Sequence, residues 1–80
     1  MREMANAIIM PKLGLSMRQG IITKWHVKMG DWVNVGDNVF SLETDKIIHD
    51  TEATAAGHVL EILYQEGDEV EVGEPCCYVG

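Results

Sequence analysis

Residues 30–37 read Gly-Asp-Trp-Val-Asn-Val-Gly-Asp, and residues 67–74 repeat this pattern as Gly-Asp-Glu-Val-Glu-Val-Gly-Glu. The two copies lie 37 residues apart, and the match extends on both sides without a gap. Further pairs keep their character at this offset: Gly20 with Gly57, Ile22 with Val59, Trp25 with Ile62, and Leu42 with Val79. A repeat this short cannot bury a hydrophobic face alone, so we expect the two copies to pack against each other as one pseudo-symmetric domain.

Each copy has the composition of short strands joined by turns. Residues 20–27 and 59–64 are rich in β-branched and aromatic residues, which favour strands. The Gly-Asp pairs mark turns in which glycine adopts positive φ. Valines that alternate with polar residues predict a short half-buried strand in each copy. These valines are Val33 and Val35 in the first copy and Val70 and Val72 in the second.

These signals predict an all-β fold, because no segment shows a sustained helical period. We expect two small antiparallel sheets, one dominated by each repeat, that pack as a sandwich or flattened barrel. Between the copies, residues 39–43 and 47–52 read as two strands of a tight hairpin. Its tip is formed by Thr44, Asp45 and Lys46.

Lys46 stands out by charge as well as by position. The formal net charge is −7, and from Met29 to the end Lys46 is the single basic residue among twelve Asp and Glu. It could be a solvated lysine that discourages edge pairing. Catalysis by its amine is disfavoured, because Glu43 and Asp45 stabilise the ammonium form and a hairpin tip has no substrate pocket. The remaining interpretation is acylation by a modifying enzyme, since the tip holds a primary amine away from the body on a rigid support.

The stretch Glu43-Thr44-Asp45-Lys46-Ile47 resembles the attachment site of lipoyl domains, in which the lysine of Glu-Thr-Asp-Lys is the modified residue. Residues 10–17, Met-Pro-Lys-Leu-Gly-Leu-Ser-Met, resemble the opening strand and loop of that family. Further matches follow in family order: Gly20, Trp25, Gly30-Asp31, Gly36-Asp37, Ala56-Gly57, Gly67, Val70, Val72 and Gly73. The resemblance covers residues 7–80, which we take as the lipoyl domain, with residues 1–6 as a flexible leader.

The resemblance implies a flattened barrel of two four-stranded antiparallel sheets, with lipoic acid in amide linkage to Lys46. The dithiolane would accept an acyl group from a thiamine-diphosphate decarboxylase component and pass it to coenzyme A at an acyltransferase catalytic domain. A lipoamide dehydrogenase would then reoxidise it. On this view the chain is a carrier without catalytic residues, cut from an acyltransferase polypeptide, and a tethered arm raises its own effective concentration at each active site. The opening loop favours a pyruvate- or acetoin-type complex.

Three features near the lysine are candidates for recognition by other proteins. Glu43 and Asp45 are candidate contacts for the lipoate-attaching enzyme, with solubilising turn charges as the alternative. The loop of residues 12–19 resembles the region near which the decarboxylase is recognised, or is a plain connection. Trp25 is expected in the core, whereas Trp32 follows a turn and is a candidate contact.

Two other functions are compatible with the pattern. A biotin carrier shares the fold and a tip lysine, but methionines usually flank biotinylated lysines, whereas Asp45 and Ile47 flank Lys46. An adaptor of the same architecture would carry no cofactor. An independent enzyme is disfavoured, because the sequence shows no nucleophile with a nearby base and no phosphate-cradling glycine loop.

Composition and charge limit the partners and the location that we expect for the protein. The negative charge argues against nucleic acid and anionic membranes as partners, and no apolar run approaches the ~20 residues of a membrane span. The adjacent Cys76 and Cys77 are badly placed to bond each other and are expected to be reduced packing residues. We expect an isolated monomeric domain in the cytoplasm, or in the mitochondrial matrix of a eukaryote.

Overall fold

A computed structural model describes residues 5–45 and 47–80, and within these residues all regular structure is β-strand. Eight strands follow one another along the chain: β1 (Asn6–Ile9), β2 (Gln19–Trp25), β3 (Trp32–Val33), β4 (Asn38–Glu43), β5 (Ile48–Glu52), β6 (Gly57–Ile62), β7 (Glu69–Glu71) and β8 (Pro75–Val79). They form two antiparallel four-stranded sheets, with orders β1-β8-β6-β3 and β5-β4-β2-β7. The described residues contain no helix that could cross a membrane.

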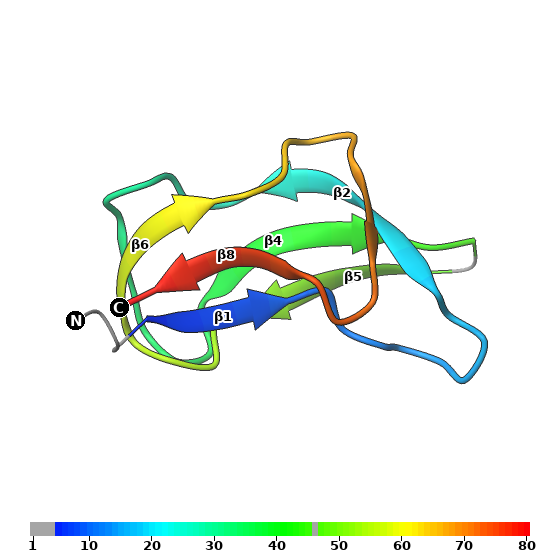
Figure 1. The fold of residues 1–80 in the computed structure, drawn as a ribbon, viewed down its shortest axis with the longest axis horizontal. Helices are drawn as coiled ribbons and strands as arrows, with labels where there is room; N and C mark the ends of the chain where they lie inside the picture. Colours follow the sequence, from blue (N-terminus) through cyan, green and yellow to red (C-terminus); the bar gives the residue numbers. More distant parts are fainter. Residues whose placement is uncertain (1–4, 46) are drawn as a thin grey trace.

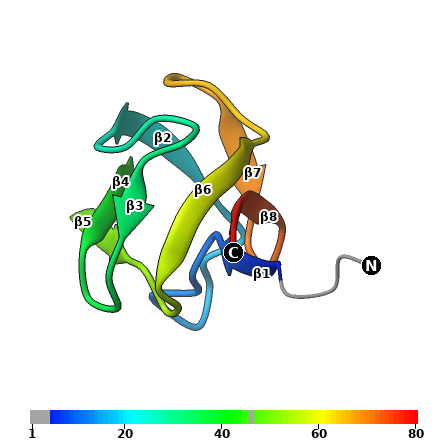
Figure 2. The ribbon, with the colours of Figure 1, turned by 90° about the vertical axis from the view of Figure 1, so that its left-hand side faces the viewer.

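The expected two-sheet architecture is confirmed, with one refinement. Each sheet takes its long strands from one repeat, but the short strands change places: β3 pairs with β6, and β7 pairs with β2. If β1 to β4 are matched in turn with β5 to β8, one sheet order becomes the other, so the fold has an internal twofold symmetry. Figures 1 and 2 show the two sheets facing each other across an elongated body, with the β4–β5 hairpin at one end and the C-terminus at the other.

Four equivalent turns explain why the glycine spacing repeats. In each, the backbone N–H after the glycine donates to the carbonyl three residues earlier, for example Asp31 to Lys28 at 3.0 Å and Asp68 to Gln65 at 3.1 Å. The third position of each turn is a glycine with φ between 91° and 95°, as a type II turn requires. These glycines are Gly30, Gly36, Gly67 and Gly73. In three of the turns, the side chain of the following aspartate also accepts a backbone N–H at 2.8 Å. The predicted Gly-Asp turns are therefore confirmed.

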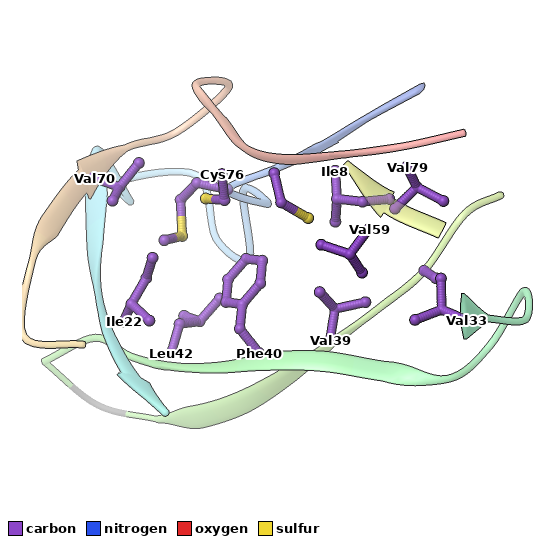
Figure 3. Packing of buried hydrophobic residues seen from close by; sticks show 13 residues of the cluster. Ile8, Ile22, Val33, Val39, Phe40, Leu42, Val59, Val70, Cys76 and Val79 are labelled. Atoms are coloured by element: carbon purple, nitrogen blue, oxygen red, sulfur yellow. The ribbon is translucent and has the colours of Figure 1, made fainter. Parts of the chain in front are cut away.

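The core lies between the sheets and receives residues from both repeats. In Figure 3, Val39, Phe40 and Leu42 of β4 point toward Ile8, Cys76 and Val79 of the opposite sheet, and all of them are buried. Trp25 packs against this core, and its ring centroid lies 5.1 Å from that of Phe40. The paired glycines Gly20 and Gly57 are required by close approach. A Cβ at Gly57 would lie 2.9 Å from the Gly80 backbone, and one at Gly20 would lie 3.1 Å from the Met10 Sδ atom.

One strand prediction was wrong. We expected Val33 and Val35 to share a short half-buried strand, but β3 ends at Val33, and Val35 is 67% exposed. The same prediction fails in the second copy, where β7 ends at Glu71 and Val72 lies in the following turn, partly buried. Val35 occupies the second position of the turn closed by the Asp37 N–H and the Asn34 carbonyl, so its side chain points away from both sheets. At the N-terminal end, β1 begins at Asn6, one residue before the expected start of the domain.

Candidate functional site

The connection between β4 and β5 is a tight turn at one end of the molecule (Figure 1). The last paired residues of the two strands are Glu43 and Ile48. Beyond them the Thr44 N–H donates to the Ile47 carbonyl at 2.9 Å, and the Ile47 N–H donates to Thr44 Oγ1 at 3.3 Å. Asp45 and Lys46 are thus the two residues between the bonded ends. The predicted hairpin and its position in the chain are confirmed.

The residues on both sides of the turn are accessible to another protein. Glu43, Asp45 and Ile47 are exposed, with Ile47 45% exposed, and Thr44 is half-buried. Lys46, the predicted attachment residue, lies outside the described residues, so its side chain is not placed. The structure therefore brings the two candidate recognition carboxylates, Glu43 and Asp45, to the same end of the domain as the turn.

A groove separates this hairpin from the long connection between β1 and β2. Its volume is about 680 Å³. One wall comes from residues 13–14 and 16–21, and the other comes from residues 43–45 and Ile47. Three carboxylates line the groove, from Glu43, Asp45 and Glu69. Arg18 is the single basic residue among the described lining residues. Glu69 is held by a hydrogen bond of 2.7 Å from the side chain of Gln19. The candidate recognition loop of residues 12–19 therefore lies beside the lysine-bearing turn.

The loop is anchored at its base and exposed at its tip. Met10 is fully buried, and Leu13 and Met17 pack against the core from partly buried positions. The Met17 N–H donates to the Gly14 carbonyl at 3.1 Å, which closes a turn around Leu15. Leu15 itself is 97% exposed. A leucine held at the tip of an anchored loop is suited to contact another protein, because its apolar surface is left in water.

A polar cluster that sequence analysis missed joins the hairpin to the end of β2. Ser41 Oγ donates to Asp50 Oδ1 at 2.5 Å and lies 2.8 Å from His26 Nε2. Since the hydroxyl hydrogen is used toward Asp50, His26 Nε2 is the donor to Ser41, which assigns the Nε2–H tautomer. The resulting contacts tie β5, an edge strand with one neighbour, to β4 and the chain after β2. Alternation places Ser41 and Asp50 on one face, but nothing in the sequence shows that His26 would cover them.

The arrangement suits a residue that a second enzyme modifies. The described residues on either side of Lys46 are exposed, and the flanking charges are negative. The hydrogen bonds between Thr44 and Ile47 hold the base of the turn. Trp32, the other candidate contact, is 57% exposed and stacks edge-on against His58 in the antiparallel pair β3–β6.

Comparisons with known proteins identify relatives along the whole domain. A family model described as "Biotin-requiring enzyme" matches residues 6–79. The chain is 40% identical over 96% of its length to the dihydrolipoyllysine-residue acetyltransferase component of the acetoin cleaving system of Bacillus subtilis. It is 38% identical, over the same share, to the dihydrolipoyllysine-residue acetyltransferase component of the pyruvate dehydrogenase complex of Corynebacterium glutamicum. It spans only 19% and 11% of the lengths of these relatives.

Two solved structures share the fold. The lipoyl domain of the 2-oxoglutarate dehydrogenase complex from Azotobacter vinelandii superposes with a TM-score of 0.71 and 32% identity, covering 92% of this chain and 96% of that one. The urea carboxylase of Kluyveromyces lactis gives a TM-score of 0.82 and 28% identity, covering all of this chain and 6% of that one. The chain therefore corresponds to a complete domain of the first protein and to a small part of the second.

Proposed function

The chain belongs to the biotin- and lipoyl-attachment family, as a lipoyl domain of the kind found in acyltransferase components of 2-oxo acid dehydrogenase complexes, and we propose that it carries lipoic acid on Lys46. The observation that carries this proposal is the exposed two-residue turn between Thr44 and Ile47, which contains the lone basic residue of the acidic region. Glu43 and Asp45 flank that residue and are proposed contacts for the enzyme that attaches the cofactor.

The fit between the site and the cofactor rests on exposure and rigidity. An amide-linked carrier needs an amine that a second enzyme can reach, on a support that does not unfold when it is approached. The exposed Asp45 and Ile47 provide the access, and the paired strands β4 and β5 provide the support. When bound, lipoic acid supplies a dithiolane that takes up an acyl group and two electrons and releases them at other active sites. The chain itself supplies the attachment residue and the exposed surface that partner enzymes would contact.

The partners follow from this role. We propose a thiamine-diphosphate decarboxylase, an acyltransferase catalytic domain and a lipoamide dehydrogenase, in a pyruvate- or acetoin-type complex. The names of the two acetyltransferase relatives support that choice, although a succinyltransferase component from Staphylococcus saprophyticus is also 40% identical over 88% of the chain. Leu15, exposed at the tip of the loop of residues 12–19, is the proposed contact for the decarboxylase. We place the protein in the bacterial cytoplasm or the mitochondrial matrix.

The attachment site is tested by modification in vitro. The purified chain is incubated with lipoate, ATP and a lipoate ligase, and its intact mass and peptide map are recorded. We expect one lipoyl increment on Lys46, and none on Lys46→Ala, whose melting temperature should stay close to that of the wild type because Thr44 and Ile47 still bond to each other across the turn. Lys24→Ala, an exposed lysine in β2, is the matched control and should be modified normally.

Other outcomes separate the alternatives. Modification by a biotin ligase but not by a lipoate ligase would favour a biotin carrier, the alternative that the family description leaves open. Failure of both enzymes on the folded chain would favour an adaptor without a cofactor. A lipoyl increment on another lysine would refute the assignment to Lys46 while keeping the carrier function.

A further inference from the structure

The turn that contains the lysine is closed in an uncommon way. In a hairpin with a two-residue loop, the flanking residues usually exchange two backbone hydrogen bonds. Here the first is present, from the Thr44 N–H to the Ile47 carbonyl at 2.9 Å. The N–H of Ile47, however, donates to the side-chain oxygen Oγ1 of Thr44 at 3.3 Å. A side chain, and not only the backbone, therefore holds the second end of the turn.

We propose that Thr44 is a positioning residue for the modification of Lys46, and that its hydroxyl is the group that sets the conformation of the turn. The inference rests on the proposed function, since it concerns the presentation of Lys46 to the attaching enzyme. Thr44 suits the role because it is half-buried, at the point where the turn meets β4, while Asp45 and Ile47 are exposed. Its hydroxyl therefore links the end of β4 to Ile47, the residue before β5, across the turn.

Positioning matters here because the amide bond forms in the active site of the modifying enzyme, to which the domain must present the amine. In the modifying enzyme the lipoate carboxylate attacks the α-phosphate of ATP, which forms the lipoyl adenylate and releases pyrophosphate. The lysine amine attacks the carbonyl carbon of this adenylate, an amide C–N bond forms, the C–O bond to AMP breaks, and the amine proton passes to a base of the enzyme or to solvent. The domain determines how often the amine is in reach of the carbonyl, and holding reactants in place accounts for a large part of such rates.

Removal of the hydroxyl alone should expose this role. Thr44→Val keeps the β-branched shape but leaves the Ile47 N–H without its acceptor, whereas Thr44→Ser keeps the acceptor and loses a methyl group. A lost hydrogen bond of ordinary strength corresponds to about a two- to twelvefold change in the population of the closed turn. We expect the kcat/KM of a lipoate ligase to fall by about that factor for Thr44→Val and to change less than about twofold for Thr44→Ser.

The experiment combines two readouts on the same samples. Amide hydrogen exchange at Ile47, followed by NMR, reports whether the turn has opened, and the rate of mass increase with lipoate, ATP and lipoate ligase reports presentation of the amine. Thr54→Val, an exposed threonine between β5 and β6, is the matched control for the chemical change and should alter neither readout. The melting temperature of each variant separates a local opening from a loss of the whole fold.

The outcomes distinguish this inference from the proposed function. Faster exchange at Ile47 with slower modification in Thr44→Val, both restored in Thr44→Ser, would support it. Wild-type modification rates in Thr44→Val, or equal losses in Thr44→Ser and Thr44→Val, would overturn it while leaving Lys46 as the attachment site. A wild-type chain that is never modified would overturn both. A loss of rate that follows a fall in melting temperature would also overturn it, because the role of Thr44 would then be general stability.

Discussion

The two cysteines are the residues whose chemistry the fold changes most. Both thiols are fully buried in β8 and lie in the core between the sheets. Burial raises the pKa of Cys76 to about 12, with further contributions from the neighbouring Cys77 and Glu74, and burial raises the pKa of Cys77 to about 11. Because the thiolate is the nucleophile, both groups are inert near neutral pH. We therefore expect these thiols not to exchange with the dithiolane of the proposed cofactor.

The raised pKa values predict a loss of stability in alkali. Both thiols ionise more readily in the unfolded chain, at their ordinary value of 9.0, than in the folded one. Their contribution is therefore complete below pH 9 and is lost as the pH rises from 9 toward 11. At about 1.4 kcal/mol per thiol per pH unit, the free energy of unfolding should fall by about 2 to 3 kcal/mol between pH 8 and pH 10.

Urea unfolding curves at the two pH values measure this loss. The double variant Cys76→Ala, Cys77→Ala is the control, since it retains the tyrosines and lysines that also titrate in this range. It should be less stable at pH 8 but should lose much less between pH 8 and pH 10. An equal pH dependence in the wild type and the double variant would show that other groups cause the alkaline loss.

At the scale of the elements, the turns are the features that determine where strands begin and end. Gly30 and Gly67 have φ of 93° and 95°, and a Cβ at either position would meet no atom within 4 Å. The cost of a side chain there is thus backbone strain alone. Gly30→Val and Gly67→Val should each lower the free energy of unfolding by about 1–3 kcal/mol, as measured by urea denaturation.

Gly14 provides the comparison for these two variants. A Cβ there would also meet nothing within 4 Å, but the backbone of Gly14 is not in the positive-φ region. Gly14→Val should therefore change stability by less than about 0.5 kcal/mol. If all three variants lose the same stability, β-branching and not the sign of φ is the cause, and the assignment of the repeated turns to positive φ loses its energetic support.

Sequence analysis found the elements that depend on local signals. The Gly-Asp turns, the long strands and the β4–β5 hairpin depend on the preferences of residues that are close in sequence, so they were predicted correctly. The second position of a type II turn accepts an apolar residue without burying it, which is why Val35 was misassigned. The pairings of β3 with β6 and of β7 with β2 depend on contacts between residues far apart in sequence, and alternation carries no information about the partner.

The connection between β1 and β2 concealed part of the symmetry. Residues of β2 and β6 match at the offset of 37. Ile8 of β1 pairs with Cys77 of β8, and Thr51 of β5 pairs with Phe40 of β4, where Cys77 and Phe40 are 37 residues apart. Ile8 is therefore equivalent to Thr51, an offset of 43. The first half therefore holds six more residues, all in the connection that forms the groove beside the hairpin. The insertion hid the equivalence of β1 and β5 from a gap-free comparison. It also makes one end of a symmetric fold different from the other, and that end contains the candidate site.

At the scale of the whole molecule, the exchanged strands lock the halves together. The sheet built on β2 and β4 of the first half takes β5 and β7 from the second half, and the sheet built on β6 and β8 takes β1 and β3 from the first half. The buried core is also shared, with Ile22, Phe40 and Leu42 from one half packed against Val59, Val70 and Val79 from the other. Neither half can bury its apolar face alone, so we expect the domain to unfold in a single cooperative transition.

A division of the chain at the lysine-bearing turn tests this dependence. Peptides of residues 1–45 and 46–80 should each give the circular dichroism of an unfolded chain, because each holds only two of the four strands of either sheet. An equimolar mixture should regain the β-sheet spectrum, with a melting temperature that rises with concentration, since association is then coupled to folding. The unmixed peptides at the same total concentration are the control. A cooperative melting transition in either peptide alone would contradict the interlocked arrangement, and a mixture that stays unfolded would show that the covalent turn supplies more stability than the shared core.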